Sequence, residues 1–204
     1  MDARLKHAGM TRTWRVRHFR TLNRYKERTL PMSHLNIEIK AKCVQPERVR
    51  NLLSARSADF KGIDHQVDTY FKVRNGRLKL REGRIERALI YYDRENTEGP
   101  KRSNVILYQP GFDPELKEIL TESMGVLAVV DKQREIYFIG NVKFHIDEVN
   151  GLGSFVEIEA IDSAGTMGEK KLREQCAGYM DLFEIRKGDL ISCSYSDMIL
   201  NLKN

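Results

Sequence analysis

The sequence has few cysteines, and the three that it contains, Cys43, Cys176 and Cys193, lie far apart. This number and spacing fit neither a zinc site nor a disulfide framework, so the chain is expected to fold without either. No apolar run approaches the ~18–20 residues that a membrane-spanning helix needs, and no apolar segment typical of a signal peptide is visible. These absences predict a cytoplasmic protein in a reducing compartment, with no membrane partner.

An excess of positive charge is missing from most of the chain, although the net charge is +6. Residues 1–31 hold nine of the 35 Lys and Arg and two of the 29 Asp and Glu, which leaves 26 basic and 27 acidic residues elsewhere. We predict a basic, disordered extension over 1–31, and a single domain over 32–204 that does not bind nucleic acid. A start codon assigned before Met32, an RNA-binding arm and a targeting peptide are the other interpretations of the extension.

Alternating apolar and polar residues after Met32 predict a domain made mostly of strands. Asn-Gly at 75–76 marks a hairpin turn. Proline favours the first turn of a helix, which supports helices at 46–58 and at 113–125, the second capped by Asp113. Further helices are expected at 166–185 and 194–200. The expected strands are 35–42, 64–73, 77–82, 87–95, 103–109, 126–139, 142–149 and 154–161. Eight strands joined mostly by hairpins close into a barrel or form a sandwich.

Charged residues occupy one phase of most expected strands, and branched apolar residues occupy the other. Side chains two apart leave the same face of a strand. A face exposed to water is expected to mix small polar residues with both charges, but here ions dominate and their signs are separated by strand. Basic residues mark 77–82, 87–95 and 126–139, whereas acidic residues mark 35–42, 142–149 and 154–161. If the strands close into a barrel with helices outside, this ionic phase lines the lumen.

Glu157 and Glu159 show what such a lumen would bind. Their side chains leave the same face roughly 6–7 Å apart along the strand, and two like charges this close need a neutralising partner. Cations that face carboxylates suit a polyphosphate with its divalent metal, because carboxylates hold Mg²⁺ or Mn²⁺ and Arg and Lys bind phosphate oxygens. Salt bridges along the lumen wall are the structural alternative.

Four segments resemble, in the same order, the sequence blocks of the CYTH family, the triphosphate tunnel metalloenzymes. They are "NIEIKAK" (36–42), "DTYFKVRNGRLKLRE" (68–82), "KFHIDEVNGLGSFVEIEA" (143–160) and "SYSDMIL" (194–200). The first resembles the E-x-E-x-K signature, and "GLGSFVEIE" is most similar to the class IV adenylate cyclase branch of a family that also contains thiamine triphosphatases. The resemblance implies an α+β fold in which helices pack outside a closed eight-stranded antiparallel β-barrel, with a divalent metal and a triphosphate substrate.

By position, the resemblance also implies roles for individual residues. The implied metal ligands are Glu38, Glu157 and Glu159, with Asp147 near the metal. The implied triphosphate ligands are Lys40, Lys79, Arg81, Arg94, Lys132 and Arg134, with Lys143 and His145 as further candidates. Glu38, Lys40 and Arg134 are the expected catalytic residues. Lys42, Arg77 and Tyr92 are weaker lumen candidates, and Tyr195 and Asp197 are expected to seal the tunnel.

Asn36 departs from the pattern, because the family has its first glutamate at this position. An amide oxygen can ligate a metal but brings no charge, so a lower metal affinity or the loss of a second metal is expected. The first interpretation of the activity is conversion of ATP to cyclic AMP and pyrophosphate. The second is hydrolysis of inorganic triphosphate, thiamine triphosphate or a nucleoside triphosphate, and the third is a non-catalytic binder of polyphosphate or nucleotide. A monomer or homodimer is expected.

Overall fold

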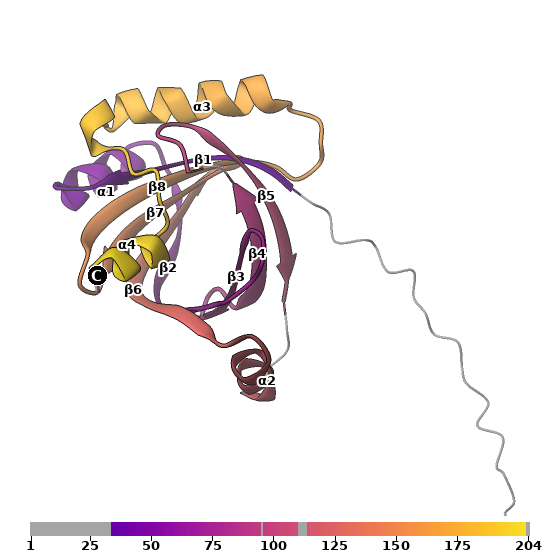
Figure 1. Cartoon of the computed structure of the whole chain (residues 1–204). Helices are drawn as coiled ribbons and strands as arrows, with labels where there is room; N and C mark the ends of the chain where they lie inside the picture. Colours follow the sequence, from indigo (N-terminus) through magenta and orange to yellow (C-terminus); the bar gives the residue numbers. More distant parts are fainter. Residues whose placement is uncertain (1–33, 95, 110–113, 203–204) are drawn as a thin grey trace, which may run out of the picture. The chain divides into compact units, whose positions relative to one another are not determined.

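Eight antiparallel strands form a closed barrel in the order β1-β5-β4-β3-β2-β6-β7-β8, which confirms the expected fold class (Figure 1). The computed structural model describes residues 34–94, 96–109 and 114–202, so the predicted extension over 1–31 and the predicted cap Asp113 lie outside the described residues. The strands are β1 (His34–Lys42), β2 (Asp59–Phe71), β3 (Arg77–Glu82), β4 (Ala88–Arg94), β5 (Lys101–Tyr108), β6 (Val126–Ile139), β7 (Val142–Val149) and β8 (Gly153–Asp162).

Helices lie around this barrel, with α3 across one side and α2 on another (Figure 1). Among the described ranges, no helix has the length and apolar character needed to cross a membrane. The helices are α1 (Pro46–Ser54), α2 (Pro114–Met124), α3 (Glu169–Leu182) and α4 (Tyr195–Asn201), with a short 3₁₀ helix, η1, at Lys187–Asp189.

The boundary between α1 and β2 differs from the sequence expectation. The helix predicted over 46–58 ends at Ser54, and β2 begins at Asp59 instead of residue 64. Ser57 has a φ of 52°, a left-handed conformation that stops a helix. The five additional strand residues, 59–63, include charged residues and show no clear alternation typical of a strand. They nevertheless belong to β2, because the 14-residue strand β6 extends to Phe138 and beyond and pairs with them. Tertiary pairing therefore decided this boundary.

The apolar phase of β1, β7 and β8 forms the core outside the barrel, as expected. Ile37 and Ile39 on β1 pack with Phe144 on β7, beneath Leu172 of α3 and Leu53 of α1. Fully burying a side chain of this size stabilises the fold by about 1.5–3 kcal/mol relative to exposure. Because helices cover the outer face of these strands, their charged phase is left facing the lumen.

Helix α4 packs across one end of the barrel. Ser194 begins it, since its hydroxyl accepts from the N–H of Asp197 at 3.1 Å. The helix is tied to the strands by Tyr195, whose hydroxyl donates to Asp147 at 2.8 Å, and by Asp197, which pairs with Arg77 at 2.9 Å. Tyr195 and Asp197 therefore tie α4 to the strands, and their role in sealing the tunnel stays a prediction.

Candidate functional site

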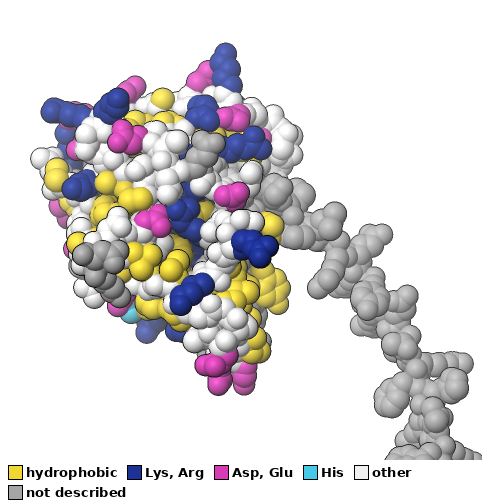
Figure 2. Space-filling view, viewed as in Figure 1, with side chains coloured by type: hydrophobic (Ala, Val, Ile, Leu, Met, Phe, Trp, Pro, Cys, Tyr) yellow, Lys and Arg dark blue, Asp and Glu magenta, His cyan; other side chains and the backbone are white. Residues whose placement is uncertain are grey.

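The barrel encloses a cavity of about 270 Å³ lined by the ionic phase of its strands. In the space-filling view, Lys and Arg atoms are visible at the centre of the molecule, beside hydrophobic side chains, and other Lys and Arg side chains are scattered over the same face (Figure 2). Ten residues of the predicted site line this one cavity, and so does the weaker lumen candidate Tyr92. The ten residues are Glu38, Lys40, Lys79, Arg81, Arg94, Arg134, Lys143, His145, Glu157 and Glu159.

Two predicted site residues belong to the lumen face of their strands but do not line the cavity. Lys132 is buried, and its Nζ donates to Asp68 at 2.9 Å. Asp147 is buried against Arg134, whose Nε donates to it at 2.6 Å. Neither side chain lines the cavity. Each pairs instead with a charged side chain of the protein. The weaker candidate Lys42 is exposed and also lies outside the cavity.

Adjacent strands β7, β8 and β1 form the acidic wall of the cavity. On β8, Glu159 lies opposite Glu38 of β1 on one side and Lys143 of β7 on the other. The next layer places Glu157 opposite Lys40 and His145. Directly opposite side chains in an antiparallel pair have Cβ atoms roughly 4.5–5.5 Å apart. The closed barrel thus brings the glutamates of β1 and β8 together, as the sequence pattern predicted.

Glu157 is the most strongly neutralised carboxylate of this wall. Lys40 Nζ lies 2.7 Å from it, Arg134 Nη2 donates to it at 2.7 Å, and His145 Nδ1 lies at 3.2 Å. Burial would raise the pKa of Glu157, but the Coulombic attraction of Lys40 and Arg134 holds it well below its usual value. Glu157 is therefore ionised, and its charge is shared with two buried cations.

Glu159 contributes to a group that fits a divalent metal. Ligand atoms of His145, Glu157 and Glu159 lie within 4.8 Å of one another. Asn36 Oδ1 is buried without a hydrogen-bond partner in the described part of the chain. Carboxylate and amide oxygens are the ligands that Mg²⁺ and Mn²⁺ prefer. The other two predicted metal ligands pair with cations of the protein: Glu38 with Arg94, and Asp147 with Arg134. The third member of the group is therefore His145.

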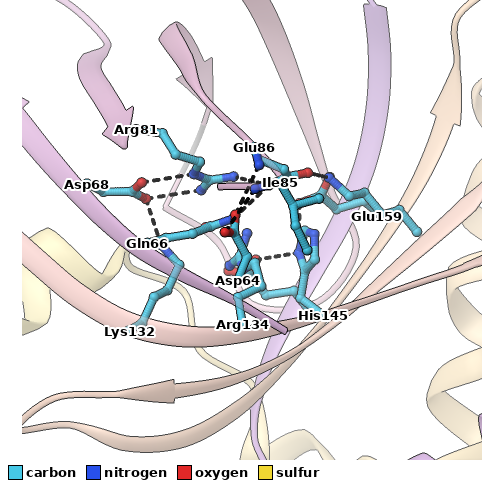
Figure 3. A network of polar contacts seen from close by, with 12 residues as sticks. Asp64, Gln66, Asp68, Arg81, Ile85, Glu86, Lys132, Arg134, His145 and Glu159 are labelled. Carbon is cyan, nitrogen blue, oxygen red and sulfur yellow. Dashed lines mark hydrogen bonds and ion pairs between the residues drawn. The ribbon is translucent and has the colours of Figure 1, made fainter. Parts of the chain in front are cut away.

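A ring of three cations surrounds Asp68 of β2 on the opposite wall, and Figure 3 labels two of them, Arg81 and Lys132. Lys79 and Lys132 each donate to its carboxylate at 2.9 Å, and Arg81 donates through two nitrogens at 2.9 and 3.0 Å. Burial opposes ionisation of Asp68, but the three cations hold its pKa well below the ordinary value. Burial lowers the pKa of Lys132 to about 7, although Asp68 acts in the other direction.

Sequence reasoning missed Asp68 and also missed Glu86 on the β3–β4 connection. Asp68 had a signal, because Asp64, Gln66 and Asp68 alternate through β2 as the other ionic phases do. Glu86 had no periodic signal, since it lies in a turn between strands. Both residues supply negative charge to a wall that the sequence pattern predicted to be basic.

Three buried polar atoms on β1, β4 and β5 lack partners among the described residues. They are Asn36 Oδ1, Arg94 Nε and Ser103 Oγ. Ser103 lies opposite Arg94 on one side and Asn36 on the other. Because buried polar groups are nearly always hydrogen-bonded, this strip of the cavity wall is suited to contact a polar ligand.

The cavity also has an apolar part, formed mainly by β4 and β5. These apolar side chains face the lumen, as the cations do, so the cavity is not purely ionic. Its side chains are Ile85, Ala88, Ile90, Val105, Leu107 and Ile161.

The profile of the CYTH domain matches residues 34–184, and the chain therefore belongs to the CYTH family. Among curated proteins, none matches the sequence at a significant level.

Solved structures share the fold at low sequence identity. A conserved hypothetical protein from Pyrococcus furiosus is 21% identical with a TM-score of 0.67, covering 79% of this chain and 98% of its own. A candidate adenylate cyclase from Vibrio parahaemolyticus is 18% identical with a TM-score of 0.64, covering 81% and 98%. A candidate adenylyl cyclase from Hippeastrum, whose dominant activity is that of a triphosphatase, is 16% identical with a TM-score of 0.53, covering 83% and 95%.

Proposed function

We propose that this protein is a divalent-metal-dependent enzyme that acts on a triphosphate inside the barrel. The observation that carries the proposal is the arrangement of two ionic walls around one cavity. Carboxylates on β1 and β8 lie on one wall, and Lys and Arg side chains on β3, β4 and β6 lie around the rest. A chain of phosphates with its metal presents the complementary charges to such a cavity.

Glu157 and Glu159 would hold the metal, with His145 beside them and Asn36 Oδ1 as a neutral oxygen. Bound there, Mg²⁺ or Mn²⁺ would supply Lewis-acid polarisation of the phosphates and partial neutralisation of their charge. Lys40 lies opposite Glu157, Arg94 lies in the same layer as Asn36, and Arg134 donates to Glu157, so all three would contact phosphate oxygens.

The cations are also placed to act in the transition state. Fixed Arg and Lys groups in a site that excludes water stabilise the charge that develops on the α-phosphate and on the leaving pyrophosphate. Arg134 suits this role because Asp147 and Glu157 hold its guanidinium from two sides. Lys79, Arg81 and Lys143 would bind the remaining phosphates.

For the reaction, we infer cyclisation of ATP to cyclic AMP and pyrophosphate. The apolar side chains on β4 and β5 favour an organic triphosphate over inorganic triphosphate, because they offer a surface that phosphate oxygens do not need. Ile90 and Leu107 lie opposite each other in this surface. The similarity of the Gly151–Glu159 segment to class IV adenylate cyclases supports the same reaction.

Hydrolysis is the second candidate, because water can replace the ribose hydroxyl as nucleophile without any change in the phosphate contacts. His145 Nε2 supports it, since this buried nitrogen has no partner among the described residues and is available to a water molecule. The Hippeastrum protein, a barrel of the same fold, has a dominant triphosphatase activity.

The deciding experiment is incubation of the purified protein with Mg²⁺ or Mn²⁺ and, separately, ATP, inorganic triphosphate and thiamine triphosphate. Cyclic AMP with pyrophosphate supports cyclisation, whereas orthophosphate supports hydrolysis. Glu159→Gln is the matched inactive control. Absence of metal-dependent turnover of all three compounds would contradict an enzymatic function and would favour a tunnel that only binds polyphosphate or nucleotide.

A further inference from the structure

Glu86 places a negative charge among the cations that are expected to bind phosphate. Its Oε2 accepts from Arg81 Nη1 at 2.8 Å and from Gln66 Nε2 at 3.0 Å, and its Oε1 pairs with Lys143 (Figure 3). Glu86 lines the cavity, and its side chain is 23% exposed. Burial opposes its ionisation, but Arg81 and Lys143 hold its pKa below the ordinary value.

The β3–β4 connection is built to hold Glu86 in this place. Asp64, which is fully buried on β2, accepts from the backbone N–H groups of Arg84 at 2.7 Å, Ile85 at 3.0 Å and Glu86 at 3.0 Å. A Cβ at Gly83 would lie 2.4 Å from Asp64 Oδ2, so the close approach requires glycine there. The backbone of the connection is therefore fixed, and only the Glu86 side chain can turn away from the cations.

Glu86 and Asp68 share Arg81, but their positions differ in one respect that matters for binding. Both residues line the cavity, but the Asp68 side chain is 1% exposed and accepts from three cations, whereas the Glu86 side chain is 23% exposed. An anionic ligand that approaches Arg81 or Lys143 therefore meets Glu86 and has to replace it.

Lys143 connects this contact to the acidic wall. It lies directly opposite Glu159 in the β7–β8 pairing, yet its Nζ is turned to Glu86. Opposite charges on directly opposed residues normally pair. The Glu86 contact thus leaves the Glu159 carboxylate available to a metal cation, next to His145 Nδ1 at 3.5 Å.

We propose that Glu86 is a specificity-determining residue, an internal anion that competes with the triphosphate for Arg81 and Lys143 and that keeps Lys143 away from Glu159. This inference rests on the proposed function. A chain of several phosphates can contact Arg81 and Lys143 together with other cations of the cavity, whereas a single phosphate makes fewer such contacts, so the chain displaces Glu86 more readily. When Glu86 is displaced, its ion pairs are exchanged for charge-assisted hydrogen bonds to phosphate oxygens.

The test is isothermal titration of the full chain with inorganic triphosphate without metal, with inorganic phosphate, and with Mn²⁺ alone. Glu86→Gln should bind triphosphate about tenfold more tightly than the wild type, a change of about 1.4 kcal/mol, and should bind inorganic phosphate measurably. It should bind Mn²⁺ severalfold more weakly, because Lys143 becomes free to pair with Glu159. Glu82→Gln is the matched control, since Glu82 is the last residue of β3, four residues before Glu86, but pairs with Lys117 outside the cavity at 2.6 Å.

A loss of affinity for triphosphate, or no change, in folded Glu86→Gln would overturn the competition. An unchanged affinity for Mn²⁺ would overturn the role assigned to Lys143. Equal effects in Glu82→Gln would show that net charge alone is responsible. If Glu86→Gln does not fold, Glu86→Ala gives the same comparison. Failure of the wild type to bind triphosphate both with and without Mn²⁺ would instead refute the proposed function, and this inference with it.

Discussion

Two carboxylates in the same barrel, the buried Asp68 and the half-buried Glu159, have opposite surroundings. Asp68 is enclosed by Lys79, Arg81 and Lys132, and its charge is satisfied within the protein. Glu159 lies opposite another glutamate, Glu38, in the strand pairing. The Nδ1 atom of His145 lies 3.5 Å from the Glu159 carboxylate. The cations around a carboxylate in the barrel therefore distinguish a structural ion, Asp68, from Glu159, the carboxylate that we propose as a metal ligand.

The first prediction removes the binding carboxylate and has the largest expected effect. Glu159→Gln should reduce metal-dependent turnover by at least about a thousandfold, roughly 4 kcal/mol in the activation free energy. The metal-free protein should be as stable as wild type or more so, because the change relieves repulsion with Glu38 and Glu157. The stabilisation by Mg²⁺ or Mn²⁺ should shrink. Thermal melts with and without metal measure these effects, and a destabilised mutant that gains fully from metal would remove Glu159 from the site.

The second prediction removes the structural carboxylate. Asp68→Asn should lower the free energy of unfolding by ~3–5 kcal/mol, because it leaves three buried cations without their shared anion. Urea denaturation measures the loss. Asp59→Asn is the control, since the Asp59 side chain is 60% exposed and pairs with Lys61 at the surface, where a salt bridge contributes at most ~1 kcal/mol. Equal losses for both variants would show that the cation ring does not need Asp68.

The third prediction uses pH to test Glu86, which is intermediate between the two. Burial acts to raise the pKa of Glu86 in the folded protein, but Arg81 and Lys143 hold this pKa below its ordinary value. The unfolded carboxyl titrates near its ordinary pKa of about 4.3, so Glu86 stabilises the fold above that pH and loses this contribution as the pH falls below it. The stability difference between wild type and Glu86→Gln should be about 1–2 kcal/mol at pH 7 and should shrink towards pH 3. A difference that grows on acidification would contradict the lowered pKa.

The smallest effect is expected from removal of residues 1–31. These residues hold the basic excess of the sequence, and the CYTH match begins at residue 34. Turnover should be nearly unchanged, and the free energy of unfolding should change by less than about 0.5 kcal/mol. Steady-state kinetics and urea denaturation of the truncated chain test this. A large loss of either would show that the barrel and its two walls depend on the extension.

Local sequence patterns determined much of this protein. Strand alternation gave the ionic and apolar faces of β1, β6, β7 and β8, because side chains two apart always share a face. Turn and helix signals such as Gly76 and Pro46 gave most element boundaries. These patterns, together with the family resemblance, were sufficient to predict a barrel with glutamates and basic residues around one lumen.

Only the tertiary structure decided which charges meet. Periodicity specifies the face of a strand but not the partner across the lumen, so it could not show that Asp147 is bound by Arg134 while Glu159 is left beside His145. It also could not identify Glu86, whose position depends on a turn held by the buried Asp64 of another strand. Ion pairs between distant segments arise only when the barrel closes, and for this reason the chain alone predicted the kind of site but not its network of charges.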